Sequence, residues 1–427
     1  MTTDTSLPAD GPQPFLSRLP TTRAGSWPAI LAIYAYAELI AACHGKTLLL
    51  VPDVARSFAV DPARASWVIA AVALVAAVGA PFGGWLIDRL GEHRAIRLGL
   101  ALAAPSSLAA AFVPRFAELV LLRVIEGAGY IAVVLGCLSL LIRTTSGPRQ
   151  TTALAFWSVA SPMGGALAIL AVSPLAGTAQ WRWVFAGHAG LLLLALVASP
   201  LLPAAPPRAR ASERGGASPW AVYRQPAALR FLGAVLLLQV FALGEAALLP
   251  TYLLTAHQLR PAEVGLLSAV SIALSVLGGV GAGVLYNRGA GIERVTAVAL
   301  LVTLAGVLVC FHPAAPTAAV IAGRLVSAIS GGAVFAWIST RIPRIAPARD
   351  QIGLASGAVS QLLYIGMTAG PPALFALYEL PGRAGFYGFI LLAYSLPLLA
   401  VARGAWRPVA EAAPAEPLHT IPPFQEF

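Results

Sequence analysis

The residues best suited to chemistry are five ionisable side chains that stand inside long apolar runs: Glu38, Arg123, Glu126, Glu245 and Arg324. A charge near the centre of a bilayer costs about 2.5–3.5 kcal/mol on insertion scales. Such residues therefore need a partner, a polar cavity or a role in function. A carboxylate in a cavity that opens to one side at a time could take up and release a proton, and a nearby arginine would favour its ionised form.

Two of these residues, Arg123 and Glu126, are three positions apart and therefore share one face of a helix. They form either a structural ion pair or a proton-coupling pair in which Arg123 controls the protonation of a carboxylate. Glu38 has Tyr34 one turn before it and Lys46 two turns after it. It either carries a proton or contacts a substrate, or it is a buried acid paired with Lys46 or an arginine.

Arg324 either binds an anionic group of a substrate or pairs with Glu126 or Glu245. The Lys46 ammonium either lines the same cavity or reaches the membrane interface while its stem stays in the apolar layer. No second histidine or cysteine stands at metal-ligand spacing beside His44, so we expect no metal and no cofactor. The predicted proton-coupling residues are Glu38, Glu126 and Arg123, and the predicted cavity lining combines charged, amide and aromatic side chains: Tyr34, Glu38, Lys46, Arg123, Trp157, Gln239, Glu245, Arg324, Gln361 and Tyr364.

The composition of the 427-residue chain indicates that these charges lie in a membrane. It has 58% hydrophobic residues, 11% charged residues and a mean hydropathy of +0.79. A soluble domain carries about 25% charged residues, so too few charges remain to cover a surface in water. The apolar runs are about 20 residues long, the length that spans a bilayer as a helix, and they lack the alternating pattern of barrel strands. We therefore predict an all-α membrane protein.

Charge and cysteine placement exclude other classes of protein. The net charge of +10 comes almost entirely from arginine, and no basic cluster is interleaved with aromatic residues, so we expect no nucleic-acid partner. Cys43, Cys137 and Cys310 all fall in apolar runs, which argues against a disulfide framework. The polar N-terminal segment lacks the basic region and cleavage site of a signal peptide.

The apolar runs predict twelve membrane-spanning helices. Between the first six and the last six lies a segment rich in proline, alanine and arginine, which we interpret as a linker. The predicted spans are 27–50, 65–87, 96–113, 118–142, 152–175, 183–202, 229–251, 263–286, 295–311, 317–340, 352–377 and 384–403.

Arginine placement predicts the orientation of these spans. One set of connections is rich in arginine and the opposite set is poorer, and positive charge stays on the cytoplasmic side. Both termini are then cytoplasmic. The predicted organisation is a cytoplasmic tail (1–26), a six-helix bundle (27–202), a cytoplasmic linker (203–228), a second six-helix bundle (229–403) and a cytoplasmic tail (404–427).

The two predicted bundles carry the same residues at a constant offset. Arg123 and Arg324 are 324 − 123 = 201 positions apart, and the pairs 182 and 383, 185 and 386, and 187 and 388 share this offset. The charged turn at 84–94 has a fainter copy at 283–294. All five buried charges fall in spans 1, 4, 7 and 10, which are equivalent under this repeat. The repeat therefore predicts that these four helices line a shared polar cavity between two similar halves.

Several motifs together resemble the major facilitator superfamily over essentially the whole chain. The turn 84–94 resembles the family's signature between spans 2 and 3, and the segment Arg123-Val-Ile-Glu-Gly-Ala-Gly129 resembles the span 4 motif of proton-linked members. The segment Trp181-Arg-Trp-Val-Phe185 resembles the start of span 6. In span 5 the sequence Ser161-Pro-Met-Gly-Gly165 stands where the efflux pattern has a Gly-Pro pair followed by two glycines.

The resemblance implies twelve helices in two pseudo-symmetric six-helix bundles and transport by alternating access. It also implies a conformational latch formed by Gly84, Asp88, Arg89, Gly91 and Arg94. Asp88 would lie near the N-terminus of span 11, where the helix dipole favours an anion. The latch would hold the two halves together on one side of the membrane while the cavity opens to the other.

The residues and the resemblance together predict a proton-coupled secondary transporter of the drug-efflux-like, proton-antiporter branch. We expect a monomer in the inner membrane that exports a small organic compound. The alternative is a proton-coupled importer of an organic anion or zwitterion, bound by Arg123, Arg324 and Lys46. An intramembrane enzyme would need a base–nucleophile pair or a metal set, and an ATP-driven pump would need a phosphate loop, which the sequence lacks.

Overall fold

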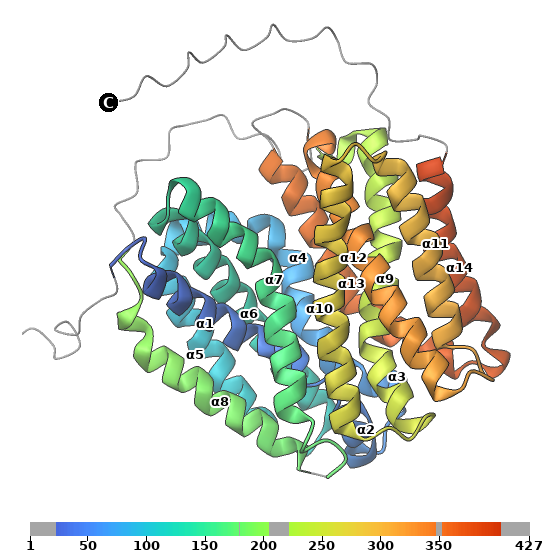
Figure 1. Ribbon diagram of the computed structural model, residues 1–427. Helices are drawn as coiled ribbons and strands as arrows, with labels where there is room; N and C mark the ends of the chain where they lie inside the picture. Colours follow the sequence, from blue (N-terminus) through green and yellow to red (C-terminus); the bar gives the residue numbers. More distant parts are fainter. Residues whose placement is uncertain (1–22, 179, 205–221, 347–351, 403–427) are drawn as a thin grey trace, which may run out of the picture.

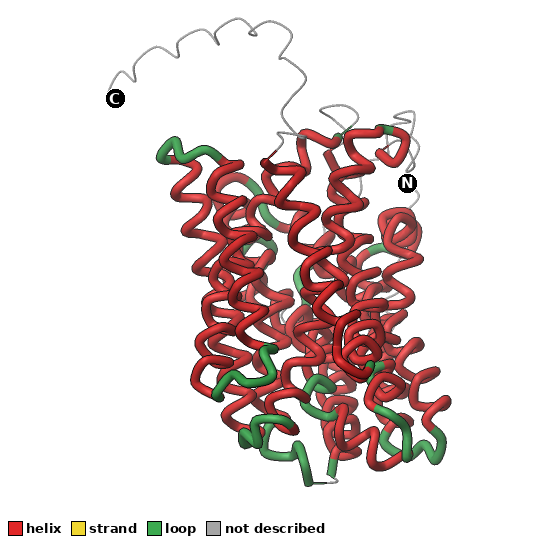
Figure 2. The backbone as a smooth tube through the Cα atoms, turned by 90° about the vertical axis from the view of Figure 1, so that its right-hand side faces the viewer, coloured by secondary structure: helices red, strands yellow, loops and turns green. Residues whose placement is uncertain are grey.

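The computed structural model describes residues 23–178, 180–204, 222–346 and 352–402. Within its helices, the side chains of residues 80–86, 88, 148, 151, 155, 158–162, 352 and 353 lie outside that description. Most of the predicted N-terminal tail and linker, and the predicted C-terminal tail, also lie outside the described residues. The described residues form helices joined by short turns, with no strand among them (Figure 2).

Twelve long helices account for most of the described chain and confirm the predicted all-α architecture. Each corresponds to one predicted span, with ends that differ by up to five residues. The helices are α1 (Trp27–Gly45), α4 (Trp67–Leu90), α5 (Glu92–Ala110), α6 (Phe116–Thr144), α7 (Gly147–Val172), α8 (Trp181–Ala198), α9 (Pro226–Thr255), α10 (Pro261–Asn287), α11 (Ile292–Cys310), α12 (Thr317–Ile345), α13 (Ile352–Glu379) and α14 (Ala384–Ala402).

Among the described residues, eight helices are long and apolar enough to cross a bilayer on their own: α1, α6, α8, α9, α10, α11, α12 and α14. The described parts of α4 and α7 contribute shorter apolar segments, Trp67–Gly79 and Met163–Val172. Helix α5 begins with the charged residues Glu92, Arg94 and Arg97, which lowers its mean hydropathy. Helices of this more polar kind remain compatible with a bilayer when neighbouring helices cover their polar faces.

The connection between the first two spans contains helical structure of its own. The first span ends at Gly45, earlier than predicted, and two short helices follow, α2 (Val51–Phe58) and α3 (Pro62–Ala65). The Asp61 side chain accepts a hydrogen bond from the backbone N–H of Arg64 at 2.6 Å and caps α3, as N-terminal aspartates do. We call this end of the bundle the α2 end (Figure 1), and the opposite end, where residues 204 and 222 lie, the linker end.

Two side-chain contacts hold α2 against the start of α8. Asp53 is buried and accepts a hydrogen bond from the Gly177 backbone N–H at 2.8 Å. Trp181 Nε1 donates to Ser57 Oγ, also at 2.8 Å. The α2 end of the N-terminal half is therefore a packed layer, because polar groups from distant parts of the chain satisfy one another there.

The helices fall into two groups, α1–α8 and α9–α14, with equivalent internal contacts (Figure 1). Helices α5 and α6 cross so closely that a Cβ on Gly99 would lie 2.6 Å from the Gly129 carbonyl oxygen. In the second group, a Cβ on Gly306 would lie 2.7 Å from the Gly323 carbonyl oxygen, where α11 crosses α12. Glycine is needed at these crossings because any side chain would collide with backbone.

The offset of 201 residues also appears in the ion pairs near the linker end. Glu92 pairs with Arg143 at 2.8 Å, and Glu293 pairs with Arg341 at 2.7 Å. The two glutamates are 293 − 92 = 201 positions apart and stand at the first turns of α5 and α11. Each pair joins the start of one helix to the end of the next, so the repeat is structural as well as sequential.

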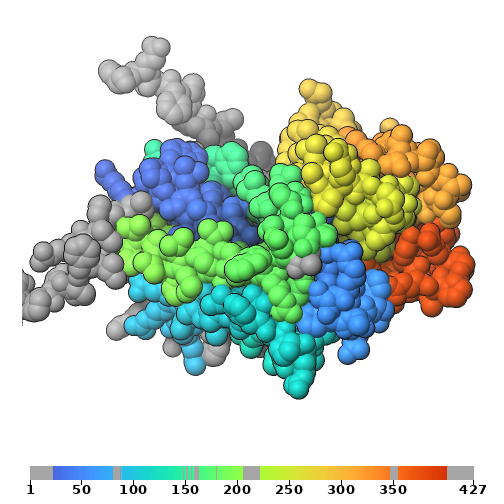
Figure 3. All heavy atoms as spheres, turned by 90° about the horizontal axis from the view of Figure 1, so that it is seen from below, coloured from blue at the N-terminus to red at the C-terminus, as the bar shows by residue number. Residues whose placement is uncertain are grey.

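Contacts between the two groups run through equivalent helices, α4 against α13 and α7 against α10. At the α2 end, α7 and the turn after it lie beside α10 (Figure 3). A Cβ on Gly265, in the first turns of α10, would lie 3.2 Å from Ser173 Cβ. Further toward the middle, Gln361 Nε2 on α13 donates to the Ala77 carbonyl on α4 at 3.2 Å. The two halves are thus in direct contact at this end and at the level of Gln361.

Candidate functional site

A cluster of ionised side chains lies buried inside the N-terminal half. Arg123 and Glu126 on α6 form an ion pair, and neither side chain is exposed. Arg123 also donates from Nε to the Val68 carbonyl at 2.8 Å and from a terminal nitrogen to the Cys43 carbonyl at 2.6 Å. Its guanidinium therefore joins α6 to α1 and α4, with donors directed to three separate acceptors.

Lys46 supplies a second positive charge to the same carboxylate. Its Nζ lies 2.7 Å from Glu126 Oε1, 2.8 Å from Ser107 Oγ and 2.8 Å from His188 Nδ1. An ammonium has three donors, and each has a partner here. The Phe185 ring lies 4.5 Å from Nζ, within cation–π range. Lys46 is thus enclosed in the protein, 2% exposed.

The hydrogen-bond pattern specifies the tautomer of His188. Its Nε2 lies 3.0 Å from the Leu39 carbonyl oxygen, which can only accept, so Nε2 carries the hydrogen. Nδ1 is then free to accept from the Lys46 ammonium. Ser107 donates to the Phe185 carbonyl at 3.0 Å and accepts from Lys46 in turn. With this neutral imidazole, the cluster holds two cations, Lys46 and Arg123, and one anion, Glu126.

Glu38 differs from the clustered charges because its carboxylate has no hydrogen-bond partner among the described residues. Both oxygens are buried and neither makes a hydrogen bond. The side chain lies against α7, where a Cβ on Gly164 would be 2.5 Å from Glu38 Oε2. The structure therefore does not pair Glu38 with Lys46 or with an arginine. A buried carboxylate in this situation carries a large penalty for its charge, which protonation or a cationic ligand would remove.

The C-terminal half contains one ion pair at the equivalent level. Arg324 on α12 donates to Glu245 Oε1 on α9 at 3.1 Å and to Ser271 Oγ on α10 at 3.2 Å. Glu245 is buried, whereas the Arg324 side chain is 18% exposed. The sequence offers two carboxylate partners for Arg324, Glu126 and Glu245. In the structure Arg324 pairs with Glu245, and Glu126 pairs with Arg123 in the N-terminal half.

The three aromatic residues of the predicted cavity lining take part in two ring pairs, the second of them with Tyr130, which was not predicted. Tyr34 on α1 and Trp157 on α7 have ring centroids 6.1 Å apart, and the Tyr34 hydroxyl donates to the Ala153 carbonyl. Tyr130 on α6 meets Tyr364 on α13 edge to face, with centroids 6.5 Å apart. The second pair brings the two halves together, so Tyr364 lies at their contact.

The amide residues of the predicted lining have two different positions. Gln361 accepts a hydrogen bond from the Tyr223 hydroxyl at 2.6 Å while its Nε2 bridges to α4. Gln239 is buried on α9 beside α13, where a Cβ on Gly366 would lie 2.8 Å from the Gln239 carbonyl oxygen. Gln239 is the repeat counterpart of Glu38, since 239 − 38 = 201, and both stand where the first helix of a half meets the fifth.

The residues of the predicted latch lie at the linker end. Arg89 and Arg94 are exposed, and Gly91 between them adopts a φ of +79°, a conformation that favours glycine. The Asp88 side chain and the surroundings of Gly84 lie outside the description. The latch therefore remains a prediction.

Three buried residues from different helices could offer ligand atoms to an ion. Cys43 Sγ, Glu126 and His188 each present one such atom, and the three atoms lie within 4.8 Å of one another. However, the Lys46 ammonium contacts the same Glu126 oxygen and the same His188 nitrogen. A tethered cation therefore takes the place that a metal ion would need, and the expectation of no metal remains a prediction.

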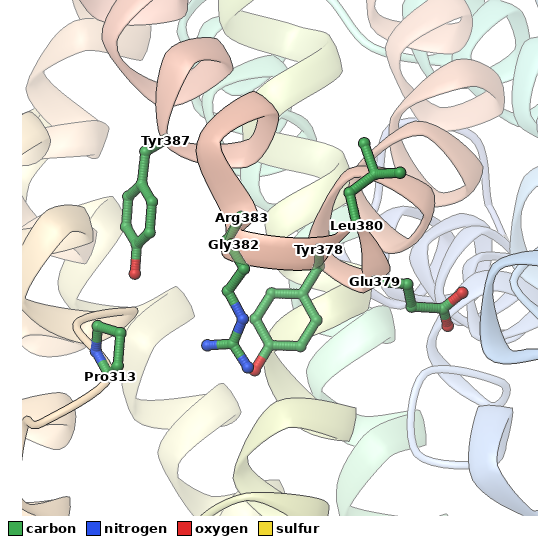
Figure 4. A pocket seen from close by; sticks show the side chains of 7 residues that line it. All are labelled: Pro313, Tyr378, Glu379, Leu380, Gly382, Arg383 and Tyr387. Carbon is green, nitrogen blue, oxygen red and sulfur yellow. The ribbon is translucent and has the colours of Figure 1, made fainter.

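A surface hollow of about 530 Å³ lies apart from these groups, at the α2 end of the C-terminal half (Figure 4). It is bordered by the end of α13 and the start of α14. Arg383 points toward the Tyr378 ring, 4.2 Å from its centroid. None of the predicted cavity residues borders this hollow, so it does not contribute to the site.

Sequence reasoning missed two members of the charged cluster, Ser107 on α5 and His188 on α8. Full charges inside apolar runs occur in spans 1, 4, 7 and 10, so they do not indicate residues of spans 3 and 6. A polar residue in an apolar run was the available signal, and His188 is the one histidine of its span. Lys46 was identified, but its enclosure by four helices depends on contacts between distant parts of the chain.

Comparison with known proteins identifies the architecture. The family model described as Major Facilitator Superfamily matches residues 29–371, most of the chain. The chain belongs to the Major Facilitator Superfamily. The family indicates a transporter rather than an enzyme, as predicted, and the long apolar helices indicate a multi-pass membrane protein.

Curated relatives place this superfamily member near drug-efflux proteins. A lincomycin resistance protein of Streptomyces lincolnensis is 29% identical over 219 residues, which cover 51% of this chain and 43% of that protein. A puromycin resistance protein of Streptomyces alboniger is 27% identical over 179 residues, 42% of this chain and 35% of that protein. The matched segments thus span less than half the length of these relatives. The relatives confirm the predicted drug-efflux-like branch of the superfamily.

Solved structures agree on the fold. A bacterial homolog of the human lysosomal transporter Spinster, in an inward-facing and unoccupied conformation, has a TM-score of 0.72. The superposition covers 88% of this chain and 98% of that one, at 16% sequence identity. At this identity the likeness concerns the fold alone.

Proposed function

We propose that the protein is a proton-coupled secondary transporter that exports a small organic compound in exchange for protons. The observation that carries this proposal is the unpartnered carboxylate of Glu38. Its charge is costly when buried, so the group is stable in two situations: protonated, or next to a cationic group of a substrate. Alternation between these two occupants is the minimum requirement for exchange of a proton against a substrate.

The Arg123–Glu126–Lys46 cluster has a different role in this proposal. Glu126 is held by two cations and a thiol within a fully enclosed region. Its proton affinity would matter only if these contacts first separated. We therefore assign proton exchange to Glu38, and we assign to Glu126, with Arg123 and Lys46, the task of holding α1, α5, α6 and α8 together as one body.

Alternating access would move the two halves against each other as bodies. The contacts of α4 with α13 and of α7 with α10 are the surfaces across which such motion would occur. In the proposed topology the α2 end faces away from the cytoplasm, both termini are cytoplasmic, and the protein works as a monomer in the inner membrane. A further relative, a multidrug export protein of Haemophilus influenzae, supports the direction of transport.

Import of an organic anion or zwitterion receives less support from the geometry. The three cations that would bind an anion are already engaged: Arg123 and Lys46 with Glu126, and Arg324 with Glu245. An anionic substrate would have to displace one of these carboxylates, whereas a cationic group could approach Glu38 without breaking a protein contact.

The test uses protein reconstituted into liposomes with puromycin as the probe. With an acidic lumen, antiport predicts puromycin accumulation above the level in protein-free liposomes, and Glu38→Gln should reduce it to that level. Glu118→Gln is the matched control, because Glu118 is a partly exposed carboxylate on α6 that pairs with Arg115. Accumulation driven instead by an acidic exterior would indicate symport, and equal activity of Glu38→Gln and wild type would remove Glu38 from the mechanism.

A further inference from the structure

A second buried polar group lies on α1, about one and two-thirds helix turns beyond Glu38. His44 Nε2 is buried and makes no hydrogen bond within the described part of the chain. The imidazole meets Tyr130 edge to face, with ring centroids 4.6 Å apart. Tyr130 in turn contacts Tyr364 of the other half. His44 therefore lies between the charged cluster and the aromatic contact that joins the two halves.

The repeat explains why His44 has no protein partner. Its counterpart at the offset of 201 is Glu245, since 245 − 44 = 201, and Glu245 pairs with Arg324. The arginine equivalent to Arg324 is Arg123, but its donors go to Glu126, the Cys43 carbonyl and the Val68 carbonyl. An arginine therefore pairs with Glu245 in the C-terminal half, whereas the equivalent arginine of the N-terminal half, Arg123, binds other acceptors. His44 Nε2 consequently receives no hydrogen bond from it.

Buried polar atoms without a hydrogen bond are uncommon in native proteins, and each one requires an explanation. The groups around His44 restrict what could bind there. Lys46 and Arg123 are cations in the adjacent cluster, their charge is only partly balanced by Glu126, and Tyr130 covers one side of the ring. A neutral imidazole offers one donor and one acceptor, which suits a neutral hydroxyl or amide, and the nearby cations Lys46 and Arg123 would repel a cationic group.

We propose that His44 is a substrate-contacting residue that binds a neutral hydroxyl or amide group of a compound whose amine binds at Glu38. This rests on the proposed function and specifies the substrate class. Residues six apart are separated by about 9 Å along a helix axis. Glu38 faces α7 and His44 faces α6, and α1 packs against both. The preferred compounds are therefore amines that carry a hydroxyl or amide in another part of the molecule.

The experiment measures binding to the purified full-length protein by titration calorimetry, so that proton coupling is not required. Puromycin, which has an amine, hydroxyls and an amide, is compared with tetraphenylphosphonium, a cation without hydrogen-bonding groups. His44→Phe should weaken puromycin binding about five- to tenfold, the effect of one lost hydrogen bond. His44→Gln, whose amide can replace Nε2, should restore most of this affinity. The affinity for tetraphenylphosphonium should be the same in all three proteins.

If His44 had only a structural role, His44→Phe would lower the affinities for puromycin and tetraphenylphosphonium equally, and that result would overturn the proposal. Unchanged puromycin affinity in His44→Phe, or no puromycin binding by the wild type, would also overturn it. His312→Phe is the matched control, since His312 is exposed in the turn after α11. Failure of the proposed function would give a different result. The affinities of the variants would follow the expected order, but the reconstituted protein would not exchange puromycin for protons.

Discussion

Lys46 Nζ lies 2.7 Å from Glu126 Oε1, and neither side chain is more than 3% exposed. A lysine in the first span is thus bound to the fourth instead of reaching the membrane interface. Because Arg123 contacts the other oxygen of the same carboxylate, Glu126 balances two cations at once. A substitution in this cluster should therefore lower the free energy of unfolding most when it leaves buried charges of one sign without a counter-charge.

Removal of Glu126 should destabilise the protein more than removal of Lys46. Glu126→Gln leaves two buried cations without an anion, and loss of one partner from a buried ion pair costs about 3–5 kcal/mol. Lys46→Met leaves a balanced Arg123–Glu126 pair and loses hydrogen bonds to Ser107 and His188, which is worth about 1–3 kcal/mol. Free energies of unfolding from denaturant titration in detergent give the comparison, with Arg115→Ala as an exposed control. A larger loss of unfolding free energy in Lys46→Met than in Glu126→Gln would contradict the assigned charge arrangement of the cluster.

Two adjacent glycines in α7 separate an effect on Glu38 from a general effect on the helix. A Cβ on Gly164 would lie 2.5 Å from Glu38 Oε2 and 2.8 Å from the Glu38 carbonyl oxygen, whereas a Cβ on Gly165 meets no atom of the described residues within 4 Å. Gly164→Ala should therefore displace Glu38 and reduce proton-driven puromycin exchange at least tenfold, a change of about 1.4 kcal/mol. Gly165→Ala should keep wild-type rates. Equal activity of the two variants in liposomes would argue against the position of Glu38.

A second pair of adjacent glycines tests the packing of the C-terminal half. A Cβ on Gly332 would collide with the Ser275 carbonyl where α12 crosses α10, but a Cβ on Gly331 has open space. Gly332→Ala should lower the melting temperature in detergent by several degrees, since overpacking typically costs about 1–3 kcal/mol. Gly331→Ala should melt with the wild type. The reverse order would mean that α10 and α12 do not cross at this point.

The contact between α7 and α10 can be used to fix the two halves at the α2 end. A Cβ on Gly265 would lie 3.2 Å from Ser173 Cβ, close to the separation found in disulfides, about 3.5–4.5 Å. The double variant Ser173→Cys/Gly265→Cys should form a disulfide under oxidation and stop exchange, and reduction should restore it. Each single variant is the control. Full activity of the cross-linked protein would show that transport does not require separation at this contact.

The number and order of the long helices could be predicted because most of the apolar runs are about long enough to span a bilayer as a helix. The ends of the helices were less predictable. Helix α1 stops at Gly45, and Asp53 and Asp61 belong to the short helix α2 and to the N-cap of α3, which the apolar pattern does not reveal. The constant offset of 201 residues between the halves is also visible in the sequence. The structure extends it to Glu92 and Glu293, which form equivalent ion pairs that the sequence comparison did not include.

The partners of the buried charges were beyond prediction from sequence. Arg123 and Glu126 could be paired because they share a helix face, but Lys46, Ser107 and His188 come from three other helices whose packing fixes their distances. The sequence likewise left Arg324 with two candidate carboxylates. Glu38 and His44 are informative for the opposite reason, since only the packed structure can show that a buried polar atom has no partner.

The central claim is that a proton and a cationic substrate alternate on Glu38. Proton release on substrate binding tests it most directly, with a pH indicator in weakly buffered detergent solution and puromycin as the ligand. The wild type should release about one proton for each puromycin bound, because the ligand displaces the proton from its site. Glu38→Gln should release none, and Glu118→Gln should match the wild type. Equal proton release from Glu38→Gln and the wild type would contradict the account.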